Sequence, residues 1–172
     1  MPLFALELKM KYENHVHPFA PVFDENSKIL ILGSFPSVKS RENAFYYGHP
    51  QNRFWKVLAE VFDAEVPQTI AEKREFLLQH HIALWDVIKS CDIVGSGDSS
   101  IRNAVANDLD EVLRIARVEH VFLNGQTAGK LYKKHCTHIA VRSTVLPSTS
   151  PANAAWSMEK LINAWKVTGE TE

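Results

Sequence analysis

The sequence predicts an α/β protein: a single-domain, three-layer α/β/α arrangement around a central, mostly parallel four-stranded sheet. Four short apolar runs, partly β-branched, alternate with segments of helical spacing, which is typical of parallel α/β sheets. A length of 172 residues suits one domain. No internal repeat or low-complexity tract divides the chain. Residues 1–172 are therefore expected to form one domain, with residues 1–18 as a loosely packed N-terminal extension.

The elements are predicted from their apolar spacing. The four strands are expected at residues 28–32, 82–87, 118–123 and 139–146. Between them, apolar residues at helical spacing predict helices that begin near residues 50–52, after the capping-box pair Thr69 and Glu72, near residue 109, after the Asn124-Gly125 turn and at Ser150-Pro151. The apolar stripes of these helices are interpreted as core.

Composition narrows the classes of function. The formal net charge of −1 gives no overall electrostatic attraction to nucleic acid, although Lys39, Arg41, Arg53 and Lys56 cluster in sequence with only Glu42 opposing them. No apolar run is long enough to span a membrane, and no signal peptide is evident. A cytoplasmic protein is expected, nucleoid-associated if bacterial, and a monomer.

Metal and cofactor chemistry is not expected. Two cysteines supply neither a disulfide framework nor an iron–sulfur cluster. The eight histidines are scattered without metal-binding spacing, so we expect no cofactor and no metal. His15 and His17, in a Pro-containing lead-in, are interpreted as surface or locally hydrogen-bonded side chains.

Polar residues gather where the predicted strands end. Ligands of open parallel sheets bind beyond the carboxyl ends of the strands. Those ends carry Gly33 to Ser37, Asp86, Asn124-Gly125 and Pro147 to Ser150. The aromatic segment that follows the first strand contains Phe45, Tyr46, Tyr47 and His49 and offers faces on which a base could stack. Filling a cluster beneath the loop is an equally good interpretation of these rings.

Ordered motif blocks resemble the uracil-DNA glycosylase superfamily, and within it the hypoxanthine (deoxyinosine) DNA glycosylase branch. The blocks are GSFPS from Gly33, YYGHPQNRFW from Tyr46, LWDVI from Leu84, GDSSI from Gly97 and LPSTSPANA from Leu146. The resemblance covers most of the chain from about Phe19 onward. It implies a monofunctional glycosylase that flips a deaminated base out of DNA and hydrolyses its glycosidic bond without lyase activity, hypoxanthine being the expected base.

Two positions depart from the superfamily pattern. Phe35 stands where relatives that remove uracil carry Asp or Asn, so this position cannot hold a water by hydrogen bonding. The resemblance then points to Asn52 as the catalytic residue, since an amide both donates to and accepts from a water. A helix-start role for Asn52 is the alternative. Leu146 stands where some relatives carry a His or Asn that stabilises charge on the leaving base.

The resemblance assigns the remaining site residues. Phe35, Tyr47, Asp86, Gly33 and Ser34 are expected to bind the base, with Tyr47 stacking on it and Asp86 reading its edge, although Asp86 could equally be a turn cap. The expected DNA contacts are Ser37, His49, Ser148, Thr149 and Ser150, the last three at a helix start.

Three alternatives remain open. The first is an enzyme that acts on uracil, on xanthine or on several deaminated bases. The second is a catalytically silent nucleic-acid-binding module, an alternative that Phe35 keeps open. A small nucleotide- or phosphate-binding protein would fit the α/β pattern, but neither GxxxxGK[ST] nor GxGxxG is present.

Overall fold

The computed structural model describes residues 12–170 and confirms the predicted fold class. Its central sheet has the strand order β3-β2-β6-β7, and all three pairings are parallel. The strands are β2 (Ile29–Gly33), β3 (Ile82–Asp86), β6 (His120–Asn124) and β7 (Ser143–Leu146). Every residue of β2 and β3 is buried, because a parallel sheet is covered on both faces and reads as continuous apolar runs.

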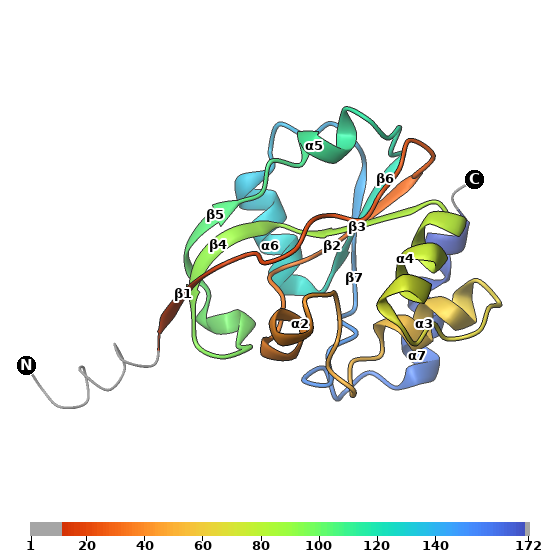
Figure 1. Ribbon diagram of the computed structural model, residues 1–172, viewed down its shortest axis with the longest axis horizontal. Coiled ribbons are helices and arrows are strands. Elements are labelled where there is room, and N and C mark those ends of the chain that lie inside the picture. The colour runs from red at the N-terminus through yellow and green to blue at the C-terminus, as the bar shows by residue number, and fades with distance from the viewer. Residues whose placement is uncertain (1–11, 171–172) are drawn as a thin grey trace, which may run out of the picture.

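Helices and a second sheet cover the parallel sheet. Figure 1 shows α3, α4 and α7 gathered on one side, with α6 and the antiparallel strands β4 and β5 on the other. The helices are α2 (Val38–Asn43), α3 (Phe54–Val61), α4 (Ile70–Gln79), α5 (Asp110–Leu113), α6 (Gln126–His135) and α7 (Met158–Trp165), with 3-10 turns η1 (Asp98–Ser100) and η2 (Lys166–Gly169). The core includes Phe54 and Trp165, whose rings meet edge to face where α3 packs on α7.

A three-stranded antiparallel sheet, order β1-β4-β5, was not predicted. It consists of β1 (Glu13–Val16), β4 (Ile88–Ile93) and β5 (Arg102–Ala106). Residues 12–18 are therefore not a loose extension: β1 pairs with β4 in register from Glu13 opposite Ile93 to Val16 opposite Ser90. The remainder of the expected extension, residues 1–11, lies outside the described residues.

Three predicted boundaries are corrected. The helix expected near residues 50–52 begins at Phe54, after a turn in which the Asn52 N–H donates to the His49 carbonyl. The helix expected at Ser150-Pro151 begins only at Met158, capped by the Ser157 side chain, which accepts from the Lys160 N–H. The last strand occupies only 143–146 of the predicted 139–146.

One half of the capping box predicted from Thr69 and Glu72 is confirmed at the start of α4. The Thr69 hydroxyl accepts from the Glu72 N–H at 3.1 Å, as an N-cap side chain does. The Glu72 carboxylate, however, accepts from the Gln68 N–H rather than from Thr69. Across residues 12–170, each helix is too short or too polar to cross a membrane.

Candidate active site

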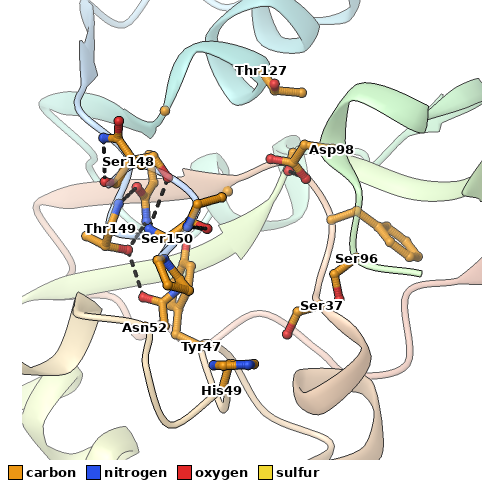
Figure 2. Close-up of a pocket in the computed structure, with 18 of the residues that line it drawn as sticks. Ser37, Tyr47, His49, Asn52, Ser96, Asp98, Thr127, Ser148, Thr149 and Ser150 are labelled. Carbon is orange, nitrogen blue, oxygen red and sulfur yellow. Dashed lines mark hydrogen bonds between the residues drawn. The ribbon is translucent and has the colours of Figure 1, made fainter. Parts of the chain in front are cut away.

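A cavity of about 1010 Å³ opens at the carboxyl edge of the parallel sheet. Because parallel strands all end at one edge, the sheet brings the residues at the ends of β2, β3 and β6 together there, as predicted. Figure 2 shows Ser148, Thr149, Ser150 and Asn52 on one side of the cavity, and Asp98, Ser96 and Ser37 facing them. Tyr47 and His49 lie between these two walls.

A hydrogen-bonded chain joins the two principal loops of the cavity, which are the loop before α3 and the loop after β7. The Asn124 Nδ2 donates to Thr149 Oγ1 at 3.0 Å, and that hydroxyl donates to Asn52 Oδ1 at 2.9 Å. Asn124 Oδ1 in turn accepts from the Thr149 backbone N–H at 3.1 Å. Backbone N–H groups only donate, so these contacts fix which end of each amide is the oxygen. Asn52 is thus tied to Asn124 through a fully buried threonine.

The same contacts define what Asn52 can offer a ligand. Its Oδ1 also accepts from the Phe54 N–H at 3.0 Å, so both lone-pair directions of that oxygen are occupied. The Oδ1 atom of Asn52 therefore has the role given by the alternative interpretation, because it stabilises the start of its own helix. The other polar atom of the side chain, Nδ2, makes no hydrogen bond to the described residues, and Asn52 lines the cavity. Asn52 presents a donor to the cavity and no free acceptor.

The loop from Pro147 to Trp156 is held by Arg53. Its guanidinium donates to the carbonyls of Trp156, Ser150 (3.1 Å) and Asn153 (3.2 Å), and its backbone N–H donates to the Thr149 carbonyl. These bonds satisfy carbonyls that a helix would otherwise have paired, which explains why residues 150–156 need no helix.

Two of the four basic residues singled out in the sequence, Arg41 and Arg53, are committed to internal contacts. Besides Arg53, Arg41 donates to the Gly95 carbonyl and lies 5.7 Å from the centre of the Phe35 ring. Lys39 forms an exposed ion pair with Glu42 at 3.4 Å. Both arginines of this group therefore hold loops in place, whereas Lys39 and Lys56 are exposed.

The aromatic segment divides into core and site. Phe45 and Tyr46 are buried in the core, as the cluster-filling interpretation has it. Tyr47 lines the cavity, but one face of its ring stacks on Phe54 at a centroid distance of 4.0 Å. Tyr47 also has a φ of 52°, a left-handed conformation that is strained for a residue with a β carbon. Its hydroxyl is buried without a hydrogen-bond partner among residues 12–170.

Burial, and secondarily the Asp86 carboxyl, raises the pKa of Tyr47 above its ordinary value. The phenol therefore stays protonated, with its O–H available as a donor. Gly33 lies at the same place. A β carbon there would overlap Asp86 Oδ1 and lie 2.8 Å from the Tyr47 oxygen, so glycine is required for this close approach.

Asp86 is buried at the end of β3, and its partner was not foreseen. His17 Nε2 lies 2.7 Å from Asp86 Oδ2, and both side chains are nearly inaccessible, with exposed fractions of 3% and 4%. The interpretation of His17 as a surface side chain is thus wrong, whereas the expected local hydrogen bond is present, from Nδ1 to the Phe19 carbonyl oxygen at 2.7 Å. The contact with Asp86 spans 69 positions, and nothing in the Pro-containing lead-in signals it.

The loop after β4 adds a carboxyl group. The Ser34 hydroxyl donates to Asp98 Oδ1 at 2.8 Å, and Figure 2 shows Asp98 at the cavity wall. The residue as a whole is exposed, yet its carboxyl group is desolvated by the wall. This desolvation raises the pKa of Asp98 above the ordinary aspartate value, although the Ser34 hydrogen bond acts in the opposite direction. The sequence had indicated only a Gly/Ser turn around Asp98 and no role for its carboxyl group.

The predicted DNA contacts lie around the cavity with differing exposure. Ser37 caps α2 by accepting from the Ser40 N–H, and His49, Ser148 and Ser150 are half-buried at the cavity. Thr149 departs from the expectation, because it is fully buried and its hydroxyl bonds internally. Ser148 to Ser150 also do not stand at a helix start, since α7 begins at Met158.

Phe35 is buried, with 7% of its surface exposed, beneath the cavity. Its ring lies edge-on to His17 at 6.0 Å and offers a ligand only an apolar contact. Across residues 12–170, no three His, Cys, Asp or Glu side chains come together as a metal site would require.

The chain is similar in sequence and in structure to known proteins. The family model of the uracil DNA glycosylase superfamily matches residues 20–168. A protein named hypoxanthine DNA glycosylase from Methanosarcina acetivorans is 35% identical over 83% of this chain and 90% of its own length. A protein of the same name from Methanosarcina barkeri is 34% identical over 78% of this chain and 86% of its own length. A solution NMR structure from M. acetivorans, described as a candidate uracil DNA glycosylase, superposes with a TM-score of 0.74 and 32% identity over 87% of this chain and 96% of its own.

Proposed function

The chain belongs to the uracil DNA glycosylase superfamily, and from this premise we propose that it excises hypoxanthine, the deamination product of adenine, from DNA. The reaction is hydrolysis of the N-glycosidic bond of a nucleotide flipped out of the duplex. Two relatives that cover most of this chain carry the name hypoxanthine DNA glycosylase, which supports that choice of base.

The observation that carries the proposal is the Asn52–Thr149–Asn124 chain at the cavity wall. It fixes an amide whose Nδ2 faces the cavity while its oxygen is held by Thr149 Oγ1 and the Phe54 N–H. An amide locked in this way has little freedom left to lose when it orients a reactant. A volume of about 1010 Å³ is ample for a flipped nucleotide.

In this proposal Asn52 orients the attacking water by donating to it. Donation through Nδ2 engages one lone pair of the water and leaves the other for attack on C1′ of the sugar. Because Oδ1 is occupied, Asn52 does not accept the water proton. A weak nucleophile suffices when the glycosidic bond breaks through an oxocarbenium-like state, as in other glycoside hydrolyses. After the bond to the base is broken, the attacking water loses its proton to solvent and the departing base anion takes one up from solvent, which gives a C1′ hydroxyl and neutral hypoxanthine.

The lining of the cavity supports simple hydrolysis over lyase chemistry. A Schiff base requires an amine nucleophile. No lysine lines the cavity among the described residues. The expected product is therefore an abasic site in an intact strand, together with free hypoxanthine.

The test is base release from an oligonucleotide carrying one inosine, with abasic sites revealed by alkali and free hypoxanthine identified by mass spectrometry. Asn52→Ala should lose most of the activity, about a hundredfold or more for a residue that positions the reacting group. Gln51→Ala, at the adjacent exposed position, is the matched control and should keep wild-type activity.

Each alternative has its own outcome in this test. Equal release from uracil or xanthine substrates would replace hypoxanthine by a broader specificity. Binding of inosine-containing DNA without any abasic product would identify a silent binding module. A fully active Asn52→Ala protein would remove the assigned role of that residue while leaving the activity in place.

A further inference from the structure

His17 lies behind the cavity, against the cavity-lining Asp86, although it precedes residues 20–168, the part of the chain that matches the family. It follows β1, whose pairing with β4 fixes its position beside the parallel sheet. The ring is enclosed by Phe19 at 4.7 Å, Tyr46 at 5.9 Å and Phe35 at 6.0 Å. His17 therefore differs from a surface histidine, because its ring is enclosed and contacts a carboxyl group that lines the cavity.

The two ring nitrogens of His17 have different partners, which determines where the protons lie. Nδ1 is 2.7 Å from the Phe19 carbonyl oxygen, which only accepts, so Nδ1 carries a proton. Nε2 is 2.7 Å from Asp86 Oδ2, so one proton lies between these two atoms. That proton belongs either to an imidazolium facing a carboxylate or to a carboxylic acid facing a neutral imidazole.

In both arrangements the other carboxyl oxygen, Oδ1, carries no proton. Asp86 Oδ1 is therefore a hydrogen-bond acceptor whichever partner holds the shared proton. It receives no hydrogen bond from the described residues, and Asp86 lines the cavity. It also approaches Gly33 so closely that a β carbon there would overlap it. The floor of the cavity thus holds one acceptor whose polarity is fixed from behind by His17.

We propose that His17 is a positioning residue that locks Asp86 Oδ1 as an acceptor and thereby selects bases that present a ring N–H at this point. The proposal rests on the function proposed above. Hypoxanthine carries a proton on N1, whereas adenine has a lone pair there, which Oδ1 would repel. The His17–Asp86 pair therefore distinguishes the damaged base from its undamaged parent.

Removal of His17 should release this polarity. Without the Nε2 contact, no described side chain fixes which carboxyl oxygen of Asp86 carries a proton, so Oδ1 is no longer confined to accepting. A protonated Asp86 donates as well as accepts and tolerates a lone pair on the base. The expected consequence is a loss of discrimination between purines, and not merely a loss of rate.

The experiment compares His17→Phe, which keeps the aromatic packing, with His15→Phe as the matched control. His15 is two residues away, and its side chain forms a hydrogen bond with Glu13, at 3.1 Å, rather than with Asp86. The substrates are oligonucleotides with one inosine or one 2′-deoxynebularine, a purine with a lone pair on N1 and no 6-oxo group. Saturating single-turnover rates and half-saturating DNA concentrations are measured for both.

His17→Phe should reduce the preference for inosine over nebularine about tenfold, the upper value for one ordinary hydrogen bond. The half-saturating DNA concentration should stay near the wild-type value, because backbone contacts are untouched. His15→Phe should preserve the preference, and His17→Gln, whose amide N–H can still donate to Asp86, should retain more of it than His17→Phe. A wild-type preference in His17→Phe would overturn the proposal.

A second measurement requires no variant. Nitrogen-15 NMR of the wild-type protein should show His17 Nδ1 protonated and Nε2 in a hydrogen bond, and an unprotonated Nδ1 would overturn the proposal even if His17→Phe fails to fold. Failure of the proposed function can be distinguished from failure of the His17 proposal, because the wild-type protein itself would then release no hypoxanthine.

Discussion

Replacement of Thr149 by valine tests how the two loops of the cavity are coupled. Valine matches the shape of threonine but removes the hydroxyl that donates to Asn52 Oδ1 at 2.9 Å and accepts from Asn124 Nδ2 at 3.0 Å. Thr149 is fully buried, so water cannot replace the lost hydroxyl directly. Asn52 Oδ1 keeps the Phe54 N–H as a partner, whereas Asn124 Nδ2 loses its acceptor at this position.

The expected loss follows from these contacts. One buried polar group left without its partner costs about 1–3 kcal/mol of unfolding free energy. In a protein of this size, each kcal/mol corresponds to about 2–4 °C in melting temperature. Asn52 also loses one of the two hydrogen bonds that hold its oxygen, and loosening a group that orients a reactant should slow base release about tenfold or more.

Thr149→Ser is the matched control. It keeps the hydroxyl and loses only a methyl group, so it should lose some stability, about 1 kcal/mol, but little activity. Urea unfolding and single-turnover base release on inosine DNA are measured for both variants. The coupling argument fails if Thr149→Val is as active as the wild type, or if Thr149→Ser is as inactive as Thr149→Val.

Three further predictions concern neighbouring contacts. Gly33→Ala should inactivate the protein and cost about 1–3 kcal/mol, because the new methyl group overlaps Asp86 Oδ1 and crowds the Tyr47 hydroxyl; a stable, active variant in urea and base-release assays would show that this spacing is not needed. Arg53→Lys should cost about 1–3 kcal/mol in urea unfolding, since an ammonium cannot match a guanidinium fork that reaches three carbonyls. Asp98→Asn should raise the melting temperature at neutral pH. The raised pKa of Asp98 means that its carboxyl stabilises the fold when protonated and loses that contribution as the pH rises through the raised value. The gain should shrink as the pH falls toward about 3.9, the ordinary aspartate value, and a pH-independent difference between the melting curves would contradict the cause given for the shift.

The sequence predicted the parallel sheet because its strands are uninterrupted apolar runs, such as Ile29–Gly33, which only a doubly covered sheet accommodates. The antiparallel sheet was missed because its strands carry mixed residues with largely exposed side chains, as in Glu13–Val16 and Arg102–Ala106. The start of the last helix was misplaced because Ser150-Pro151 is a good helix opening locally. Long-range hydrogen bonds from Arg53 hold that segment as a loop instead.

Only those site residues that lie at the strand ends or within the motif blocks could be predicted from the sequence. Asn52 and Asp86 are at the cavity because they lie beside those features. Their partners could not be read, since Asn52 meets Thr149 across 97 positions and Asp86 meets His17 across 69. The amide of Asn52 was expected both to donate and to accept, and only the contacts with Thr149 and the Phe54 N–H reveal that its oxygen is occupied.

The central claim is that this superfamily member removes hypoxanthine, and a competition experiment tests it most directly. The wild-type protein is incubated with a mixture of otherwise identical duplexes that carry one inosine, one uracil or one xanthine, with abasic product from each quantified in the same reaction. The inosine duplex should be converted first, and Asn52→Ala should lose most of this conversion. Preferential conversion of uracil, or DNA binding without any abasic product, would contradict the central claim.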